Sequence, residues 1–132
     1  MKKLIIGLLF SMVFTSAFAQ SWIRVAYNEE NIYEIRQGSV EANATTSGVK
    51  VYVAVGRTIT LASKKISASL WYVSVEDCKL QRGKFVVLGT SGEFQSEHDF
   101  VFGLGTISAT IAEIICTVAS SASPKNKPSP SV

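Results

Sequence analysis

Histidine is nearly missing from this sequence: His98 is the only one among 132 residues. A typical zinc site combines several histidine and cysteine ligands, and a Ser-His-Asp triad needs a histidine beside its serine. The chain also has no glycine-rich nucleotide-binding fingerprint, and its segment Gly89-Thr90-Ser91-Gly92 differs from the nucleophile elbow Gly-x-Ser-x-Gly. We therefore interpret residues 89–92 as a turn and predict a protein that is not an enzyme, with no cofactor and no bound metal.

His98 lies between two carboxylates, in Glu97-His98-Asp99, which is a run of three potential metal ligands. Side chains of consecutive residues diverge, and no second histidine is present to complete a zinc site. A solvated loop is therefore the expected setting of His98.

The N-terminus has the three parts of a secretory signal peptide. Met1-Lys2-Lys3 is followed by an apolar run from Leu4 to Phe14 and then by Ala17-Phe18-Ala19. We predict cleavage between Ala19 and Gln20; an uncleaved anchor is the alternative, for which the apolar run is short. No cysteine follows Ala19 that could carry a lipoprotein anchor, so the mature protein is expected to be periplasmic or secreted, without stable membrane insertion.

The excess of basic residues does not belong to the body of the protein. The chain has 13 Lys and Arg against 10 Asp and Glu, and removing Lys2 and Lys3 leaves 11 basic residues. Lys125 and Lys127 fall in the tail, so residues 20–119 carry nine basic against ten acidic residues. Nucleic-acid binding needs a concentrated basic face, and we predict no nucleic-acid partner.

Cysteine is also scarce: Cys78 and Cys116 are the only two in the sequence. In an exported chain an even number of cysteines indicates disulfide bonding, and two cysteines allow a single pairing. The alternative, a reactive thiol pair, lacks the Cys-x-x-Cys spacing of redox sites. The predicted bond would fasten a C-terminal helix to a sheet.

Apolar alternation and turn residues predict one α+β domain over residues 20–119, between the signal peptide (1–19) and a disordered tail (120–132). The fold class is an antiparallel β-sheet meander of about five to six strands with one C-terminal α-helix packed on it. We expect a loop over 41–48, a bulge or bend at Gly56, and a polar segment over 93–99 that could add a short strand. The main strands are expected at residues 21–27, 32–35, 49–61, 67–79 and 84–89.

The C-terminal helix has an apolar stripe of Ile107, Ile111, Ile114 and Ile115, a cap at Thr106 or Ser108, and an end at Cys116. Within the expected strand 67–79, Glu76 and Asp77 would face opposite sides and could not form a catalytic carboxylate pair. We assign Asp77 a structural role as a hydrogen-bond acceptor that positions Cys78. Trp22, Trp71 and Tyr72 are interpreted as packing residues. Asn43-Ala44-Thr45 matches a glycosylation acceptor, but the leader looks bacterial.

Several of these segments together resemble the surface-adhesin protein E family. They are Trp22 after the signal peptide, Tyr33, Val49-Lys50-Val51-Tyr52-Val53, Val75-Glu76-Asp77-Cys78, Gly105-Thr106 and the helix that carries Cys116. The resemblance spans about residues 21–117 and implies an antiparallel sheet, one C-terminal helix and a Cys78–Cys116 bond. It also implies adhesion to host matrix or serum glycoproteins, although that adhesin is displayed through a lipid anchor that this chain lacks.

The sequence therefore predicts a non-enzymatic exported bacterial envelope protein that acts as an adhesin E-like binding or interaction module. A protein partner is expected, either a host matrix glycoprotein or an envelope protein. The alternative is a periplasmic accessory, inhibitor or immunity-type protein.

Overall fold

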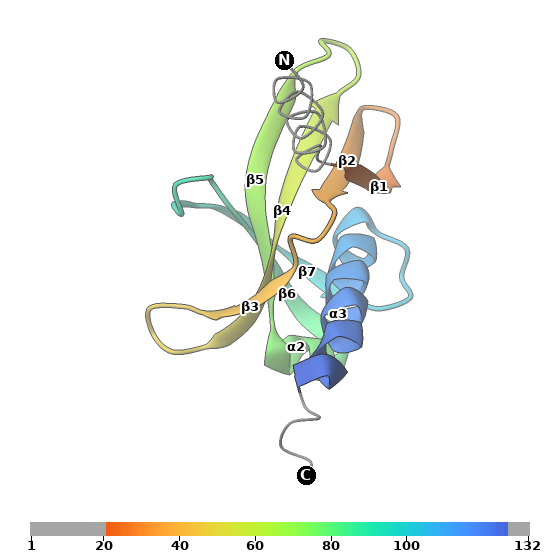
Figure 1. Ribbon diagram of the computed structural model, residues 1–132. Helices are drawn as coiled ribbons and strands as arrows, with labels where there is room; N and C mark the ends of the chain where they lie inside the picture. The colour runs from red at the N-terminus through yellow and green to blue at the C-terminus, as the bar shows by residue number, and fades with distance from the viewer. Residues whose placement is uncertain (1–20, 127–132) are drawn as a thin grey trace, which may run out of the picture.

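A seven-stranded antiparallel sheet and a long C-terminal helix form the protein in the computed structural model, which describes residues 21–126. The strands are ordered β1-β2-β4-β5-β6-β7, and β3 pairs with β4 beside β2. The predicted cleavage site lies outside the described residues. The predicted fold class is confirmed (Figure 1). The elements are β1 (Trp22–Tyr27), β2 (Asn31–Arg36), β3 (Glu41–Ala44), β4 (Lys50–Thr60), β5 (Ile66–Ser74), α2 (Val75–Leu80), β6 (Arg82–Leu88), β7 (Phe94–Val101) and α3 (Ile107–Asn126).

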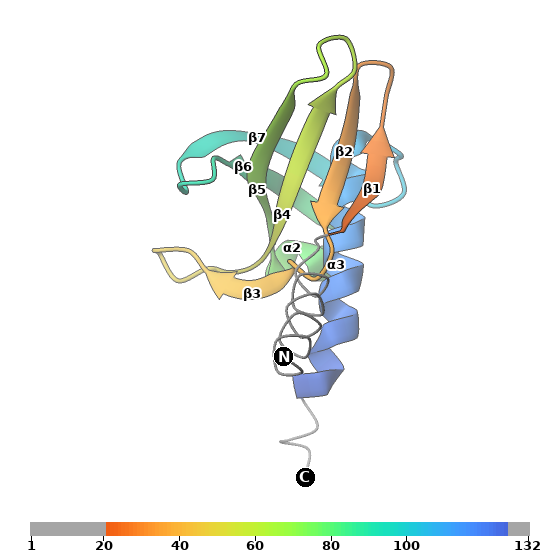
Figure 2. The same cartoon turned by 45° about the horizontal axis from the view of Figure 1, so that its top comes forward.

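Helix α3 lies across one face of the sheet (Figure 2). Its isoleucines Ile111 and Ile115 are essentially inaccessible to solvent, and Ala109 and Ala112 let the helix approach the strands closely. Thr106 caps the helix, because its Oγ1 accepts a hydrogen bond from the backbone N–H of Ala109 at 3.1 Å. The strands supply the other half of the core, chiefly Ala54, Trp71, Val73, Phe85 and Phe100.

The predicted disulfide is present between Cys78 and Cys116, whose Cα atoms are 5.6 Å apart. It joins α2 to the middle of α3, rather than a strand to the end of a helix. Helix α3 continues ten residues past Cys116 to Asn126, so residues 120–126 extend the helix instead of beginning the tail. Residues 127–132 lie outside the described residues.

The strand predicted over residues 67–79 ends at Ser74, and the segment that follows is the short helix α2. Ser74 is its N-cap, with Oγ accepting from the N–H of Asp77 at 3.0 Å, and Gln81 ends it in the left-handed conformation. Glu76 and Asp77 in the first turn suit the positive end of the helix dipole. The assignment of both carboxylates to opposite faces of a strand was therefore wrong.

Three further expectations need correction. Residues 41–44 form β3, which pairs with β4. They show no apolar periodicity, because the side chains on both faces of this strand are exposed. Gly56 is not at a bulge, since β4 pairs with β5 without a register shift; it leaves space for Trp71, whose ring would lie 2.4 Å from an added Cβ. His98 belongs to β7, not to a loop.

Candidate functional site

The two faces of the sheet differ in what covers them. Tyr52 and Ala54 of β4 and Trp71 and Val73 of β5 point toward α3 and belong to the core. Side chains alternate along a strand, so their neighbours point the other way. We call the side opposite α3 the open face. Its apolar side chains are Val51, Val53, Val55, Leu70, Tyr72, Val86 and Leu88.

Strand pairing brings the open-face side chains together in rows. Tyr72 of β5 lies between Val53 of β4 and Val86 of β6. In the same way, Leu70 of β5 lies between Val55 of β4 and Leu88 of β6. Val51 and Val86 are 3% and 6% exposed although α3 is on the other side, so the apolar side chains of this face shield one another. The remaining five are half-buried. Apolar side chains that reach the surface together can mark an interaction site, and on this face the five half-buried side chains do so.

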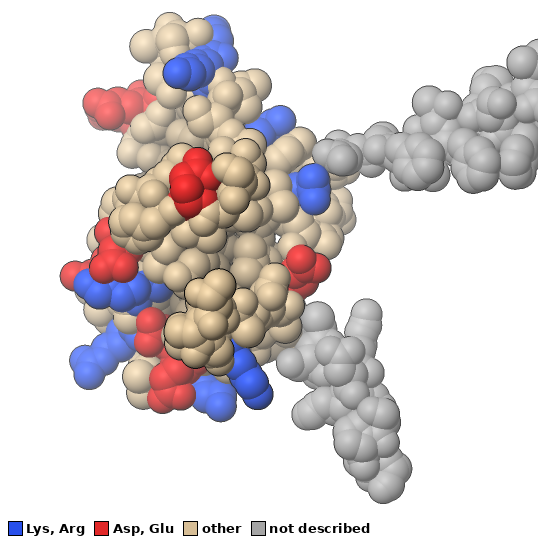
Figure 3. Space-filling model, turned by 90° about the vertical axis from the view of Figure 1, so that its left-hand side faces the viewer, with Lys and Arg blue, Asp and Glu red and all other residues tan. Residues whose placement is uncertain are grey.

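Two turns project beside this face. The β3–β4 turn over residues 45–49 and the β6–β7 turn over residues 89–93 both extend to the side away from α3 (Figure 1). Viewed from that side, most Lys, Arg, Asp and Glu side chains lie toward the margins of the surface, and one acidic group lies near its middle (Figure 3). The predicted turn at 89–92 is confirmed, with the Gly92 N–H donating to the Gly89 carbonyl at 2.9 Å.

An ion pair lies at the border of the open face on the β2 side. Arg57 Nε donates to Glu34 Oε1 at 2.7 Å, and the Arg57 guanidinium stacks 4.2 Å from the Trp22 ring. The Trp22 ring of β1 thus contacts a cation of β4. Its companion Trp71 lies in the core and meets Phe85 edge to face at 5.9 Å. Tyr72, assigned by the sequence to packing, lies half-buried on the open face.

A cluster of charges closes the opposite side, on β6 and β7. Lys84 Nζ lies 2.6 Å from Asp99 Oδ1 and 3.9 Å from Glu97 Oε2, and the hydrogen bond with Asp99 raises the pKa of Lys84. His98 points to the other face of β7 and contacts Ser96 Oγ at 3.1 Å. The two carboxylates and the imidazole that are adjacent in sequence are therefore separated, as alternation requires.

Asp77 makes the kind of contact that its predicted structural role requires. Its Oδ2 accepts a hydrogen bond from the backbone N–H of Lys84 at 3.0 Å. Asp77 is the residue before Cys78, so this bond connects α2 to the start of β6 next to the disulfide. Asn43, in the glycosylation-like tripeptide, is exposed on β3, and its Oδ1 accepts from the N–H of Ala44 at 2.8 Å.

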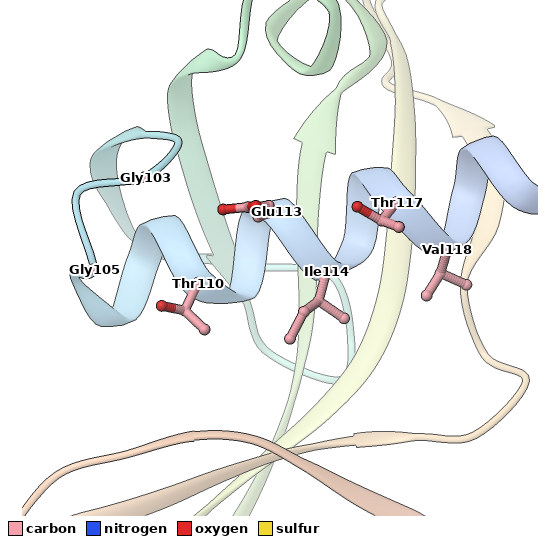
Figure 4. A pocket seen from close by; sticks show the side chains of 7 residues that line it. All are labelled: Gly103, Gly105, Thr110, Glu113, Ile114, Thr117 and Val118. Atoms are coloured by element: carbon pink, nitrogen blue, oxygen red, sulfur yellow. The ribbon is translucent and has the colours of Figure 1, made fainter.

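The outer side of α3 carries a separate hollow of about 430 Å³. Thr110, Ile114 and Val118 extend from the same side of the helix into it, and Glu113 is its one ionisable lining residue (Figure 4). A single carboxylate with threonines and aliphatic side chains does not form an acid–base pair. The full lining is Gly103, Gly105, Thr110, Glu113, Ile114, Thr117 and Val118.

The sequence indicated the alternation of Val49-Lys50-Val51-Tyr52-Val53 but not which set would meet the helix. Valines are the more apolar set, yet Tyr52 and Ala54 form the helix side. The signal that could have shown this is Gly56, which shares a face with Ala54 and gives Trp71 its space under α3. The open face is thus a feature that sequence reasoning missed.

Among residues 21–126, no three Asp, Glu, His or Cys side chains lie together as a metal site would require. Neither described helix combines the length and the apolar character needed to cross a bilayer. No protein-family model, no curated protein and no solved structure matches this chain.

Proposed function

We propose that this chain is a non-enzymatic exported envelope protein of a bacterium that binds a protein partner on its open face. The observation that carries the proposal is the row of apolar side chains on β4, β5 and β6 that lies on the side of the sheet away from α3 and outside the core cluster. Half-buried Tyr72 lies at its centre, and aromatic residues are enriched at the energetic centres of protein interfaces. The ion pairs at Arg57 and Lys84 supply a polar rim.

The resemblance to surface-adhesin protein E supports a matrix or serum glycoprotein of the host as the partner. The disulfide supports export, because such bonds form and persist in oxidising compartments. The alternative is a periplasmic accessory, inhibitor or immunity-type protein. The same open face would serve it with a partner from the envelope.

Binding of the mature chain, residues 20–132, to a panel of matrix and serum glycoproteins tests the proposal. Leu70→Gln places an amide at the middle of the open face and should weaken binding about tenfold, as loss of a well-packed interface side chain does. Val118→Gln makes the same kind of change on the outer side of α3, where Val118 is 45% exposed, and should have no effect. Thermal melts of both variants control for misfolding.

Equal loss in both variants, or none in either, would contradict a role of the open face. Cell fractionation, with protease treatment of intact cells, separates the two classes of partner. Digestion by external protease supports surface display and a host glycoprotein. Protection together with recovery in the periplasmic fraction supports the accessory role, which pull-down from periplasm then tests.

A further inference from the structure

Strand β7 presents the longest regular free edge among the described strands. It has eight residues, and it pairs with β6 from Ser96 to Val101 without irregularity. The other border strands are less suited to pairing: β1 has a register shift between Arg24 and Ala26, and β3 has four residues. Unpaired edges are templates for a further strand, and bulges or short length block them.

The hydrogen-bond pattern shows which backbone groups of β7 point outward. The N–H of Phe102 donates to the Gln81 carbonyl at 3.0 Å, in line with the β6–β7 register. Bonded and non-bonded residues alternate in an antiparallel ladder, so Phe100, His98 and Ser96 face β6. The N–H and C=O groups of the alternate residues point away from β6. These residues are Glu97, Asp99 and Val101.

The same three residues present their side chains on the open face, all exposed. Asp99 is 81% exposed and Glu97 47%, and Val101 is 42% exposed. Lys84 is the one cation bonded to the two carboxylates, so this cluster keeps a net charge of −1. A strand added here would set two of its alternate residues opposite Glu97 and Asp99, and opposite charges in such cross-strand pairs are favourable.

In the register centred on His98, a second copy of this chain fits the edge poorly. Antiparallel pairing of two β7 strands about His98 would set each Glu97 opposite the other copy's Asp99. Four carboxylates would then share two lysines, and like charges directly opposite are destabilising. The complementary occupant has basic side chains where this edge has acidic ones.

We propose that the outer edge of β7 adds, in the antiparallel direction, an extended segment of a partner protein with the pattern apolar-x-basic-x-basic. The two basic side chains pair with Glu97 and Asp99, the apolar one contacts Val101, and backbone hydrogen bonds continue the sheet. The inference rests on the proposed protein-binding function and names the chemistry of the bound segment. It also extends the partner's contact from the edge onto the adjoining open face.

Two synthetic eight-residue peptides of equal composition test it against the mature, disulfide-bonded protein. One has valine at its second position and lysine at the fourth and sixth; the other has its two lysines adjacent, on opposite faces of a strand. The alternating peptide should bind about tenfold more tightly. Its binding should shift the amide resonances of Glu97, Asp99 and Val101 and weaken with added salt.

Charge variants should move the affinity in opposite directions. Glu97→Gln with Asp99→Asn should weaken the alternating peptide to the level of the adjacent-lysine peptide. Lys84→Gln should strengthen it, because it leaves both carboxylates uncompensated while the Lys84 N–H still reaches Asp77. N-methylation of the peptide on the edge that faces β7 should abolish binding, and N-methylation on its other edge should not.

Equal affinity of the two peptides, no binding of either, or resonance shifts away from β7 would overturn the inference. Its failure is distinguishable from failure of the proposed function. In one outcome, Leu70→Gln weakens glycoprotein binding, whereas the peptides and the Glu97 and Asp99 variants have no effect on it. That outcome would support the open face as the binding site and would refute strand addition at the β7 edge. Peptide binding at β7 without any glycoprotein binding would support strand addition at the edge and would refute a host glycoprotein as the partner.

Discussion

Asp77 Oδ2 accepts a hydrogen bond from the backbone N–H of Lys84 at 3.0 Å, across the turn that connects α2 with β6. The contact is possible because Gly83 has no side chain: a Cβ there would lie 2.1 Å from the Asp77 carboxyl carbon. This turn also fixes Cys78, the next residue after Asp77, in position to reach α3.

Gly83→Ala should therefore destabilise the protein by about 1–3 kcal/mol, the usual cost of overpacking, measured by urea denaturation. Gly48→Ala is the matched control, since Gly48 also has a positive φ but no atom within 4 Å of the added Cβ. The control should lose only the smaller conformational term. Equal losses would mean that contact with Asp77 is unimportant.

Gly56→Ala tests the corresponding contact under α3. The added Cβ would meet the six-membered ring of Trp71 at 2.4 Å, and no unusual φ contributes at this position. We expect a loss of about 1–3 kcal/mol in the free energy of unfolding. In a Trp71→Phe background, where that ring is smaller, the same substitution should cost less. Additive losses in the double variant would contradict the explanation.

Replacing both Cys78 and Cys116 by alanine should lower the melting temperature. The chain-entropy model gives about 4 kcal/mol as an upper expectation for a loop that separates the cysteines by 38 positions. Both cysteines line a hollow of about 390 Å³, so a small thiol can reach the bond. The reduced wild-type protein should have the same melting temperature as the double variant. Two free thiols in protein recovered from the periplasm would refute the disulfide.

Glu93 provides a prediction about pH. Ser91 Oγ donates to Glu93 Oε1 at 2.5 Å and holds the pKa of this exposed carboxyl below its ordinary value of 4.5. A depressed folded-state pKa contributes stability that is present above the ordinary value and is lost as the pH falls through the lowered one. Carbon-detected NMR titration should show the low pKa, and Ser91→Ala should return it toward 4.5. An unchanged pKa in that variant would assign the shift elsewhere.

Heparin should bind weakly and elute below physiological salt. Lys64 and Lys65 lie in the β4–β5 turn, whereas Arg82 and Lys84 begin β6 beyond the other end of β5. Strand β5 has nine residues and spans about 30 Å, shorter than the strand predicted from sequence but long enough to keep the clusters apart. Retention well above physiological ionic strength would show that one basic patch exists after all.

Local signals in the sequence were sufficient for much of this fold. The isoleucine stripe predicted the helix, the apolar runs and glycine turns predicted the meander, and two cysteines allowed one bond. Helix α2 was missed because Trp71 to Val75 alternates like a strand, although Ser74 followed three residues later by Asp77 is an N-capping signature. Strand β3 has no such signal, since its residues are exposed and its pairing with β4 uses backbone groups alone.

The sequence by itself determined that β4 alternates, that α3 is amphipathic and that Cys78 can bond only to Cys116. Only the tertiary structure decided which face of the sheet α3 covers, and hence which face is open. That choice depends on how closely a helix can approach a particular set of side chains. Ala54 and Gly56 leave the depth that Trp71, Ile111 and Ile115 fill, so the valines of β4 remain on the other side.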